Sequence, residues 1–396
     1  MCGIMNTLKE NSGFGKNTAY QVIYYFAFIL YSSAYIISFT TLDNYHLTNS
    51  IQYLVILLLF TLLIIRFVSN DFSFPSFALA FCFLTIGFIS WHVTNEKDLL
   101  IVFAFIVVSD QVPVKKLAKI VLTEEIIICI LVISLSHFGL IENYSYIRNG
   151  TVGSTRVRYA MGFSHPNRFG SSMLAIACAY AVIHFKKFRK IDILLYVLLS
   201  MMTIIIADSR TSALMILLVM FFAAFLNKRR YILSTRAICI GMILIYLGIV
   251  ILSLYEMCFF NSRNFFMRSL DKLLSGRFML AHFYFEKNPI RLFGYNSSLL
   301  KHYITGFDNI MIDNAYAKLL ILYGIFPGII FLCIYLLIFL HSLKSNYISA
   351  AVFAAFIYAC VGLTESQALH FAMNYSLIGC AFIFNKKFSI IKKKRY

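Results

Sequence analysis

The sequence predicts an all-α integral membrane protein, a single polytopic domain over residues 1–396 that crosses the bilayer about twelve times. Composition is the first reason: 60% of the residues are hydrophobic and only 13% are charged. Soluble domains have about 45–50% apolar and 25% charged residues. The second reason is that the apolar residues form long blocks. The third reason is that no polar stretch between the blocks is long enough to hold a soluble domain.

A membrane-spanning helix needs about 20 mostly apolar residues. The first candidate block follows Lys9 and Lys16 and predicts a retained signal anchor, because no clean cleavage site is visible. The fourth block is the weakest, since its uninterrupted apolar part, Leu99–Val108, is short, and it has a re-entrant or interfacial segment as its alternative. Twelve blocks are candidate spans: 20–39, 51–68, 74–91, 98–114, 120–138, 168–185, 191–207, 211–227, 236–255, 315–340, 347–363 and 369–385.

The basic residues predict the orientation, because lysine and arginine accumulate on the cytoplasmic side of membrane proteins. Basic clusters at 186–190, 228–230 and 392–395 all fall on one side if the N-terminus is inside. Both termini are therefore predicted to be cytoplasmic, and two long outer loops follow, at 139–167 and 256–313. Apolar residues at helical spacing in the second loop predict an amphipathic helix on the membrane, with a restart capped by Ser275.

The formal net charge of +18 does not indicate nucleic acid, since membrane insertion accounts for the cytoplasmic share of it. The basic residues assigned to the outer side are different in kind, because arginine outnumbers lysine among them. Arginine offers a planar fork of donors that matches phosphate oxygens. Two interpretations stay open: an anionic ligand handled at the outer face, or solvated charge in long loops, which escape the charge rule.

The segment at 156–170 predicts an anion site at a helix start. Pro166 presets its own backbone and keeps His165 extended, and Asn167 is the predicted cap of the next helix. A helix N-terminus offers free N–H groups and partial positive charge to an anion. His165 is either a proton carrier or a structural histidine that holds the turn. The predicted diphosphate ligands here are Arg156, Arg158 and Arg168.

Further candidates lie in two other polar segments. Asp208 and Arg210 form a turn between the seventh and eighth blocks, where they either neutralise each other or bind and orient phosphate. Asp313 and Asn314 return polar groups to the mouth of the tenth block, and Arg277 lies in the second long loop. The scattered cysteines and the lack of a paired D-x-D carboxylate motif predict no metal site and no cofactor.

The residues 162–170, Gly-Phe-Ser-His-Pro-Asn-Arg-Phe-Gly, resemble the G-F-x-H-P-N-x-F-G signature of Wzy-type O-antigen and capsular polysaccharide polymerases. Ser209-Arg210-Thr211 is similar to the S-R-S/T turn of that family. The later pattern of the family is matched by Arg277, Phe293-Gly294, Asp313-Asn314-x-Tyr316, Leu319-Leu320 and Tyr323-Gly324.

The resemblance implies a glycosyltransferase of a bacterial cytoplasmic membrane that joins undecaprenyl-diphosphate-linked sugar repeats at the outer face. The acceptor hydroxyl would attack the anomeric carbon of the donor, and undecaprenyl diphosphate would leave. His165 and Asp313 are the candidate bases. The arginines would stabilise the leaving diphosphate without a metal, with Asn167, Asp208 and Asn314 in support. Membrane lipids and a chain-length regulator are the other expected partners.

Two alternatives stay open. An O-antigen ligase uses the same donor with a different acceptor. A flippase or transporter of lipid-linked oligosaccharides would also suit about twelve spans, although such proteins tend to show repeated halves and broken helices at mid-membrane.

Overall fold

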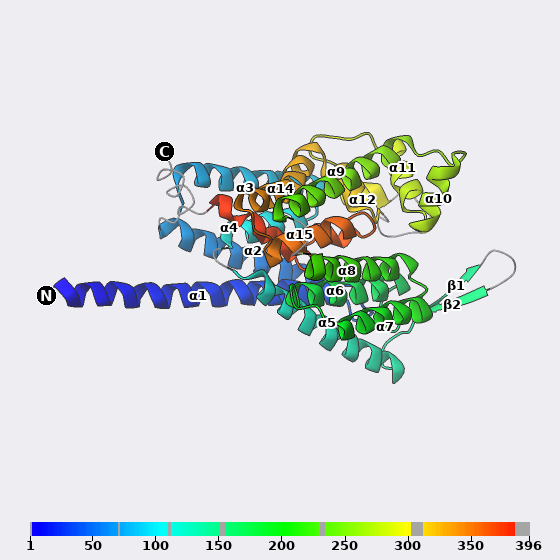
Figure 1. Ribbon diagram of the computed structural model, residues 1–396, viewed down its shortest axis with the longest axis horizontal. Coiled ribbons are helices and arrows are strands. Elements are labelled where there is room, and N and C mark those ends of the chain that lie inside the picture. Colours follow the sequence, from blue (N-terminus) through cyan, green and yellow to red (C-terminus); the bar gives the residue numbers. More distant parts are fainter. Residues whose placement is uncertain are drawn as a thin grey trace.

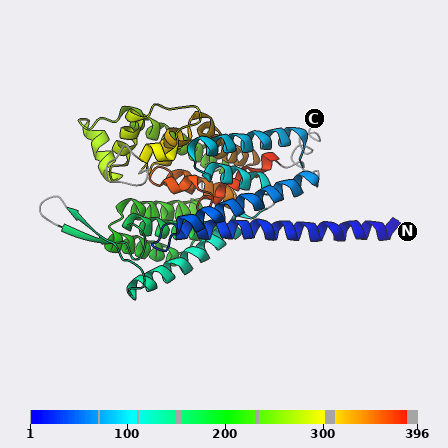
Figure 2. The same cartoon turned by 180° about the vertical axis from the view of Figure 1, so that it is seen from behind.

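The computed structural model describes residues 2–69, 72–109, 112–149, 155–229, 234–301 and 312–384. The chain folds into a bundle of helices from which α1 (Cys2–Ile37) projects at one end and a β-hairpin projects at the other (Figures 1 and 2). We call these the α1 end and the hairpin end. The other long helices are α2 (Tyr45–Val68), α3 (Phe74–Thr94), α5 (Val114–His137), α6 (Pro166–Ile183), α7 (Lys190–Ala207), α8 (Arg210–Arg229), α9 (Thr235–Phe259) and α14 (Ile325–Ser345).

Shorter elements complete the fold. Helices α10 (Phe265–Leu273) and α11 (Arg277–Lys287) lie together at the hairpin end (Figure 1). The remaining short elements are α4 (Asp98–Val108), α12 (Ser297–Lys301), α13 (Ala315–Lys318), the π-helical turn η1 (Leu319–Tyr323), α15 (Ala350–Val361) and the 3₁₀ helices η2 (Ser366–Leu369) and η3 (Tyr375–Phe384).

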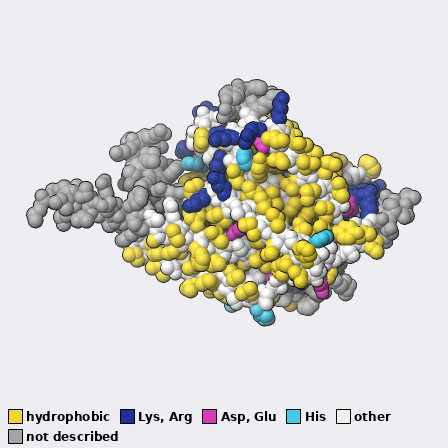
Figure 3. Space-filling view, turned by 90° about the horizontal axis from the view of Figure 1, so that it is seen from below, with side chains coloured by type: hydrophobic (Ala, Val, Ile, Leu, Met, Phe, Trp, Pro, Cys, Tyr) yellow, Lys and Arg dark blue, Asp and Glu magenta, His cyan; other side chains and the backbone are white. Residues whose placement is uncertain are grey.

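The outer surface of the bundle has the character of a lipid-facing surface. Within the described residues, 7 helices are long and apolar enough to cross a membrane: Thr18–Ile37 of α1, α2, α3, α7, Arg210–Asn227 of α8, α9 and α14. Leu57 and Ile64 of α2 and Ile205 of α7 expose more than half of their area. One face is covered largely by hydrophobic side chains, with Lys and Arg gathered in separate groups (Figure 3). A contiguous apolar exterior of this kind belongs in lipid, so the chain is an all-α multi-pass membrane protein apart from the hairpin.

The hairpin is the departure from the predicted all-α architecture. Strands β1 (Ser145–Asn149) and β2 (Thr155–Tyr159) pair antiparallel, with Tyr146 opposite Arg158 and Ile147 opposite Val157. Aromatic and β-branched residues at these positions favour strands. The first long loop, 139–167, is therefore ordered along both of its arms, and its second arm leads into the start of α6.

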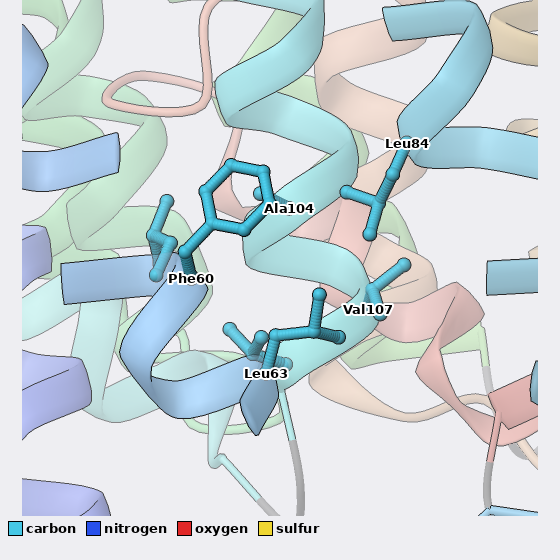
Figure 4. Close-up of a pocket in the computed structure, with 7 residues that line it drawn as sticks. Phe60, Leu63, Leu84, Ala104 and Val107 are labelled. Atoms are coloured by element: carbon cyan, nitrogen blue, oxygen red, sulfur yellow. The ribbon is translucent and has the colours of Figure 1, made fainter. Parts of the chain in front are cut away.

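The fourth predicted span is a short helix in the centre of the protein. All eleven residues of α4 are buried, so this segment contacts protein on all sides. It packs on α2, α3 and η3, and the rings of Phe105 and Phe371 stack with centroids 4.4 Å apart. The small gap left between α2, α3 and α4, about 10 Å³, is lined only by apolar side chains and offers a ligand no polar contact (Figure 4).

Three of the later predicted spans have different boundaries in the structure. The block 315–340 is divided, because the run of α13 and η1 ends at Tyr323, and the long helix α14 starts at Ile325 after Gly324. The block 347–363 contains the 12-residue α15, and the block 369–385 contains the 10-residue η3. With α4 at 11 residues, these helices are shorter than the roughly 20 residues of a straight span. Twelve crossings therefore remain a prediction.

The division at Gly324 depends on a close backbone crossing. Gly294 (φ +76°) and Gly324 (φ +92°) touch there, and a Cβ on Gly294 would overlap the Leu322 carbonyl group. Tyr295 N donates to Leu322 O, and Ile325 N donates to Arg291 O, each at 3.0 Å. The crossing fixes the part of the second long loop that directly follows α11 against the bundle.

We expect Gly294→Ala to destabilise the protein far more than Gly276→Ala. Both glycines have a left-handed backbone, which costs an L-residue about 1–2 kcal/mol, but a Cβ on Gly276 (φ +83°) meets nothing within 4 Å. Overpacking should add about 1–3 kcal/mol at Gly294. The measurement is the yield of monodisperse protein and its thermal midpoint in detergent. Equal losses for both variants would contradict the crossing.

Candidate functional site

A polar cavity of about 350 Å³ opens at the hairpin end of the bundle. Its walls come from the hairpin, the start of α6, the turn between α7 and α8, the start of α11 and the segment before α13, so elements far apart in sequence converge there. The lining residues are Tyr146, Ile147, Arg158, His165, Asn167, Asp208, Ser209, Arg210, Thr211, Ser275, Arg277 and Asp313. Seven of the ten predicted site residues are among them.

Arg158 joins three elements at the wall of the cavity. From strand β2, its Nε donates to the carbonyl of Ala207 at the end of α7 at 2.8 Å. Its Nη2 donates to Oδ1 of Asn167 in the first turn of α6 at 2.5 Å. The guanidinium therefore holds the hairpin, α6 and α7 in a fixed relation and brings positive charge to the C-terminal end of α7, which favours a cation.

His165, and not Asn167, is the N-cap of α6. The His165 backbone is extended (φ −157°, ψ 147°), as Pro166 requires, and its Nδ1 accepts the backbone N–H of Asn167 at 3.1 Å. The cap prediction was wrong because Asn167 lies inside the first turn and its side chain is engaged by Arg158. The capping histidine places its ring in the cavity wall, 4.8 Å from the ring of Tyr146.

The protonation of His165 follows from this environment. Burial and, to a smaller extent, the positive charges of Arg158 and Arg168 lower the pKa of His165 to about 4, against a smaller opposing effect of Asp313. The imidazole is therefore neutral near neutral pH. Since Nδ1 accepts a hydrogen bond, the single ring proton is on Nε2. In this state His165 offers the cavity a donor.

Asp208 is shared by two arginines. It ends α7 in a left-handed conformation (φ 43°), with Nε of Arg210 at 3.1 Å and Nη1 of Arg156 at 3.9 Å from its Oδ1. The side chains of Arg156 and Arg210 remain 62% and 55% exposed, whereas that of Asp208 is 7% exposed. One carboxylate between two open guanidinium groups leaves excess positive charge at this side of the cavity.

Arg277, in contrast to these exposed arginines, is buried and lies between two carboxylates. Its side chain is 4% exposed, with Nε 3.6 Å from Asp313 Oδ2 and Nη2 3.2 Å from Glu365 Oε1. Burial by itself would lower the pKa of the guanidinium, but Glu365 and Asp313 together raise it above its ordinary value. Among the described residues, its buried Nη1 has no hydrogen-bond partner. Arg277 therefore lines the cavity with one of its donors buried and unpaired.

Glu365 was missed by the sequence analysis. It lies between α15 and η2 with a side chain 8% exposed. Besides Arg277, it accepts hydrogen bonds from Ser171 Oγ of α6 at 3.1 Å and Ser212 Oγ of α8 at 3.3 Å. The buried carboxylate thus ties α11 to the two helices that start at the cavity. The signal available in the sequence was a lone acid in an apolar stretch, which in a membrane protein indicates a functional or paired group.

Three predicted site residues do not line the cavity. The side chain of Arg156 contacts Asp208, which lines the cavity, but does not line the cavity itself. The guanidinium of Arg168 lies over the ring of Phe39, 4.4 Å from its centroid. Asn314 is fully buried, and its Oδ1 caps α13 by accepting Tyr316 N and Ala317 N, each at 3.0 Å. Asn314 therefore fixes the backbone next to Asp313.

The second long loop turns where the sequence predicts, with a different cap. Its helical part is divided into α10 and α11 at Ser275-Gly276. Ser275 has a left-handed backbone (φ 62°), and the first N–H groups of α11 are accepted by Asp271, whose Oδ1 lies 2.9 Å from Phe278 N. The sequence predicts Ser275 as the cap because it lies just before α11. Asp271 lies several residues earlier, and its role depends on the turn that brings it back to the helix start.

Within the described residues, no group of three or more His, Cys, Asp or Glu side chains could hold a metal ion. No protein-family model, curated protein or solved structure matches the chain. The function is therefore argued from the cavity.

Proposed function

We propose that this chain is a metal-independent glycosyltransferase that polymerises undecaprenyl-diphosphate-linked oligosaccharide repeats at the outer face of a bacterial cytoplasmic membrane. In this topology the chain crosses about twelve times, both termini are cytoplasmic and the hairpin end faces outward. The observation that carries the proposal is the cavity at the hairpin end, where Arg158, Arg210 and Arg277 converge with His165 and Asp313.

The two sides of the cavity suit the two halves of a glycosyl transfer. The open arginines around Asp208 suit a diphosphate, because guanidinium groups bind phosphate oxygens in pairs. As the bond from the anomeric carbon to the phosphate oxygen breaks, its electron pair goes to the diphosphate, and preplaced positive charge stabilises it. The Nε2–H of His165 is a further donor on that side.

The acceptor hydroxyl then belongs beside Asp313. Its oxygen forms the new bond to the anomeric carbon, and its proton goes to the carboxylate. Asp313 fits this part because its side chain is 41% exposed and is held by Arg277. His165 fits it less well, because the ring nitrogen that could take a proton is occupied by the Asn167 N–H.

The experiment is turnover of one defined lipid-linked repeat by the purified full chain in nanodiscs. We expect a ladder of lengthened lipid-linked chains, and we expect Arg210→Ala to lose about 10²–10³-fold in rate. The matched control is Arg268→Ala, an exposed arginine of α10 that does not line the cavity. An unchanged ladder from Arg210→Ala would overturn the assignment.

The same assay separates the rival functions. Transfer of the glycan to a different acceptor molecule, with no lengthening of the lipid-linked chain, indicates a ligase. Movement of single repeats across a proteoliposome membrane without any lengthening indicates a flippase.

A further inference from the structure

A second cavity, of about 550 Å³, lies between the start of α5 and the end of α6. Helices α5 and α6 pack against each other, and α6 starts at the polar cavity and ends at this one, so the two cavities are one helix length apart. The lining residues are Pro113, Lys115, Lys116, Lys119, Ile183, His184 and Lys187. None of them belongs to the site described above.

Four lysines face this second cavity, and none of them is paired with an acid in the described part of the chain. Across the residues that the structure describes, no carboxylate lies within 4.0 Å of Lys115, Lys116, Lys119 or Lys187. Asp192 is the acid linked to this region through Tyr180, which stacks on His184. Both Asp192 oxygens are engaged, one by the Tyr180 hydroxyl and one by the Arg189 N–H.

The lysines contact a carbonyl group and an aromatic ring, neither of which neutralises their positive charge. Lys115 Nζ donates to the carbonyl of Ile183 at 3.0 Å, and Lys116 Nζ lies 3.8 Å from the centroid of the Tyr25 ring. Burial lowers the pKa of Lys115, and repulsion from Lys187, Lys186 and Lys119 lowers it more. The cluster is therefore strained by like charges, and an anion in the cavity would relieve the strain.

The charge rule of membrane insertion explains why lysines are numerous at such an end but not why they converge. That rule depends on how many basic residues flank a span, wherever they point. Here two helix ends bring them around one hollow whose other walls, Pro113 and Ile183, are apolar. A hollow of this kind between membrane helices fits a lipid headgroup, with phosphate on the cations and glycerol against the apolar wall.

We propose that this cavity binds the phosphate of an anionic phospholipid, with the exposed Lys119 and Lys187 as cationic contacts. The occupant is a membrane phosphodiester, as distinct from free phosphate, because the cavity is partly apolar and adjoins α5, whose Ile127 and Ile130 expose more than half of their area. The site does not depend on the proposed enzymatic function.

The experiment is lipid binding by the full chain in detergent, followed by native mass spectrometry with phosphatidylglycerol or phosphatidylcholine added. We expect phosphatidylglycerol to be retained preferentially. Lys119→Gln/Lys187→Gln should weaken that binding roughly 30-fold, from the usual contribution of a lysine near an anionic headgroup. No internal hydrogen bond or ion pair of these two side chains is recorded among the described residues, so the variant should fold.

The control is Lys190→Gln/Lys344→Gln, which removes two exposed lysines that do not line the cavity and should leave binding unchanged. Equal retention of both lipids, or equal loss in both double variants, overturns the proposal. A third arm adds inorganic phosphate without lipid: tight binding that depends on Lys119 and Lys187, together with no lipid preference, would show a free-phosphate site and would also overturn it.

Discussion

Arg277→Ala should abolish polymer formation and destabilise the protein by about 3–5 kcal/mol, the usual cost of removing one partner of a buried ion pair. The variant leaves Glu365 buried with only the hydroxyls of Ser171 and Ser212. It also removes a guanidinium group from the lining of the cavity. The readouts are the thermal midpoint in detergent and the ladder made in nanodiscs.

A double variant separates the two effects of Arg277. Arg277→Met/Glu365→Leu removes both buried charges, and replacing a buried ion pair with apolar residues is often neutral for stability. Asp313 stays partly exposed and can be hydrated. We expect the double variant to recover the thermal midpoint and to remain inactive. Recovery of the ladder along with the midpoint would show that the guanidinium has only a structural role.

Asp313→Asn should lower turnover by about 10²–10⁴-fold, the usual contribution of a general base. The fold should be retained, because the side chain is 41% exposed and Arg277 keeps Glu365. The comparison is His165→Asn, which keeps a side chain able to cap α6 and removes the imidazole. Its effect should be much smaller.

The pH dependence tests the same assignment. Since burial and the nearby arginines lower the pKa of His165 to about 4, the imidazole is already neutral at pH 5 and stays neutral above it. His165→Asn should therefore leave the shape of the pH–rate profile unchanged between about pH 5 and pH 8. If His165→Asn lowered turnover as much as Asp313→Asn, the assignment of Asp313 and not His165 as the base would be contradicted.

The sequence predicts the membrane class and most of the cavity because both are local properties. Apolar blocks are visible in any window of the chain, and the turn after α7 carries Asp208 and Arg210 side by side. The role of Glu365 could not be predicted from the sequence, because its contacts are not local. Its partners Arg277, Ser212 and Ser171 are 88, 153 and 194 residues away, and no local pattern connects them.

The boundaries of the predicted spans differ from those of the helices where backbone geometry overrides hydropathy. The block 315–340 is apolar across Gly324, so a window average runs through the residue at which the helix changes direction. The reason for that change is the contact with Gly294, which is remote in the sequence.

The burial of α4 has a consequence for how the chain is made. Every side chain of this helix is covered by protein, and part of the cover comes from η3, which is the last described element of the chain. Arg66 at the end of α2 likewise donates to the carbonyl of Phe384 at 3.2 Å. While the ribosome is still producing the C-terminal quarter, α4 lacks this cover. The centre of the protein therefore closes only late in biogenesis, after the flanking helices have entered the bilayer.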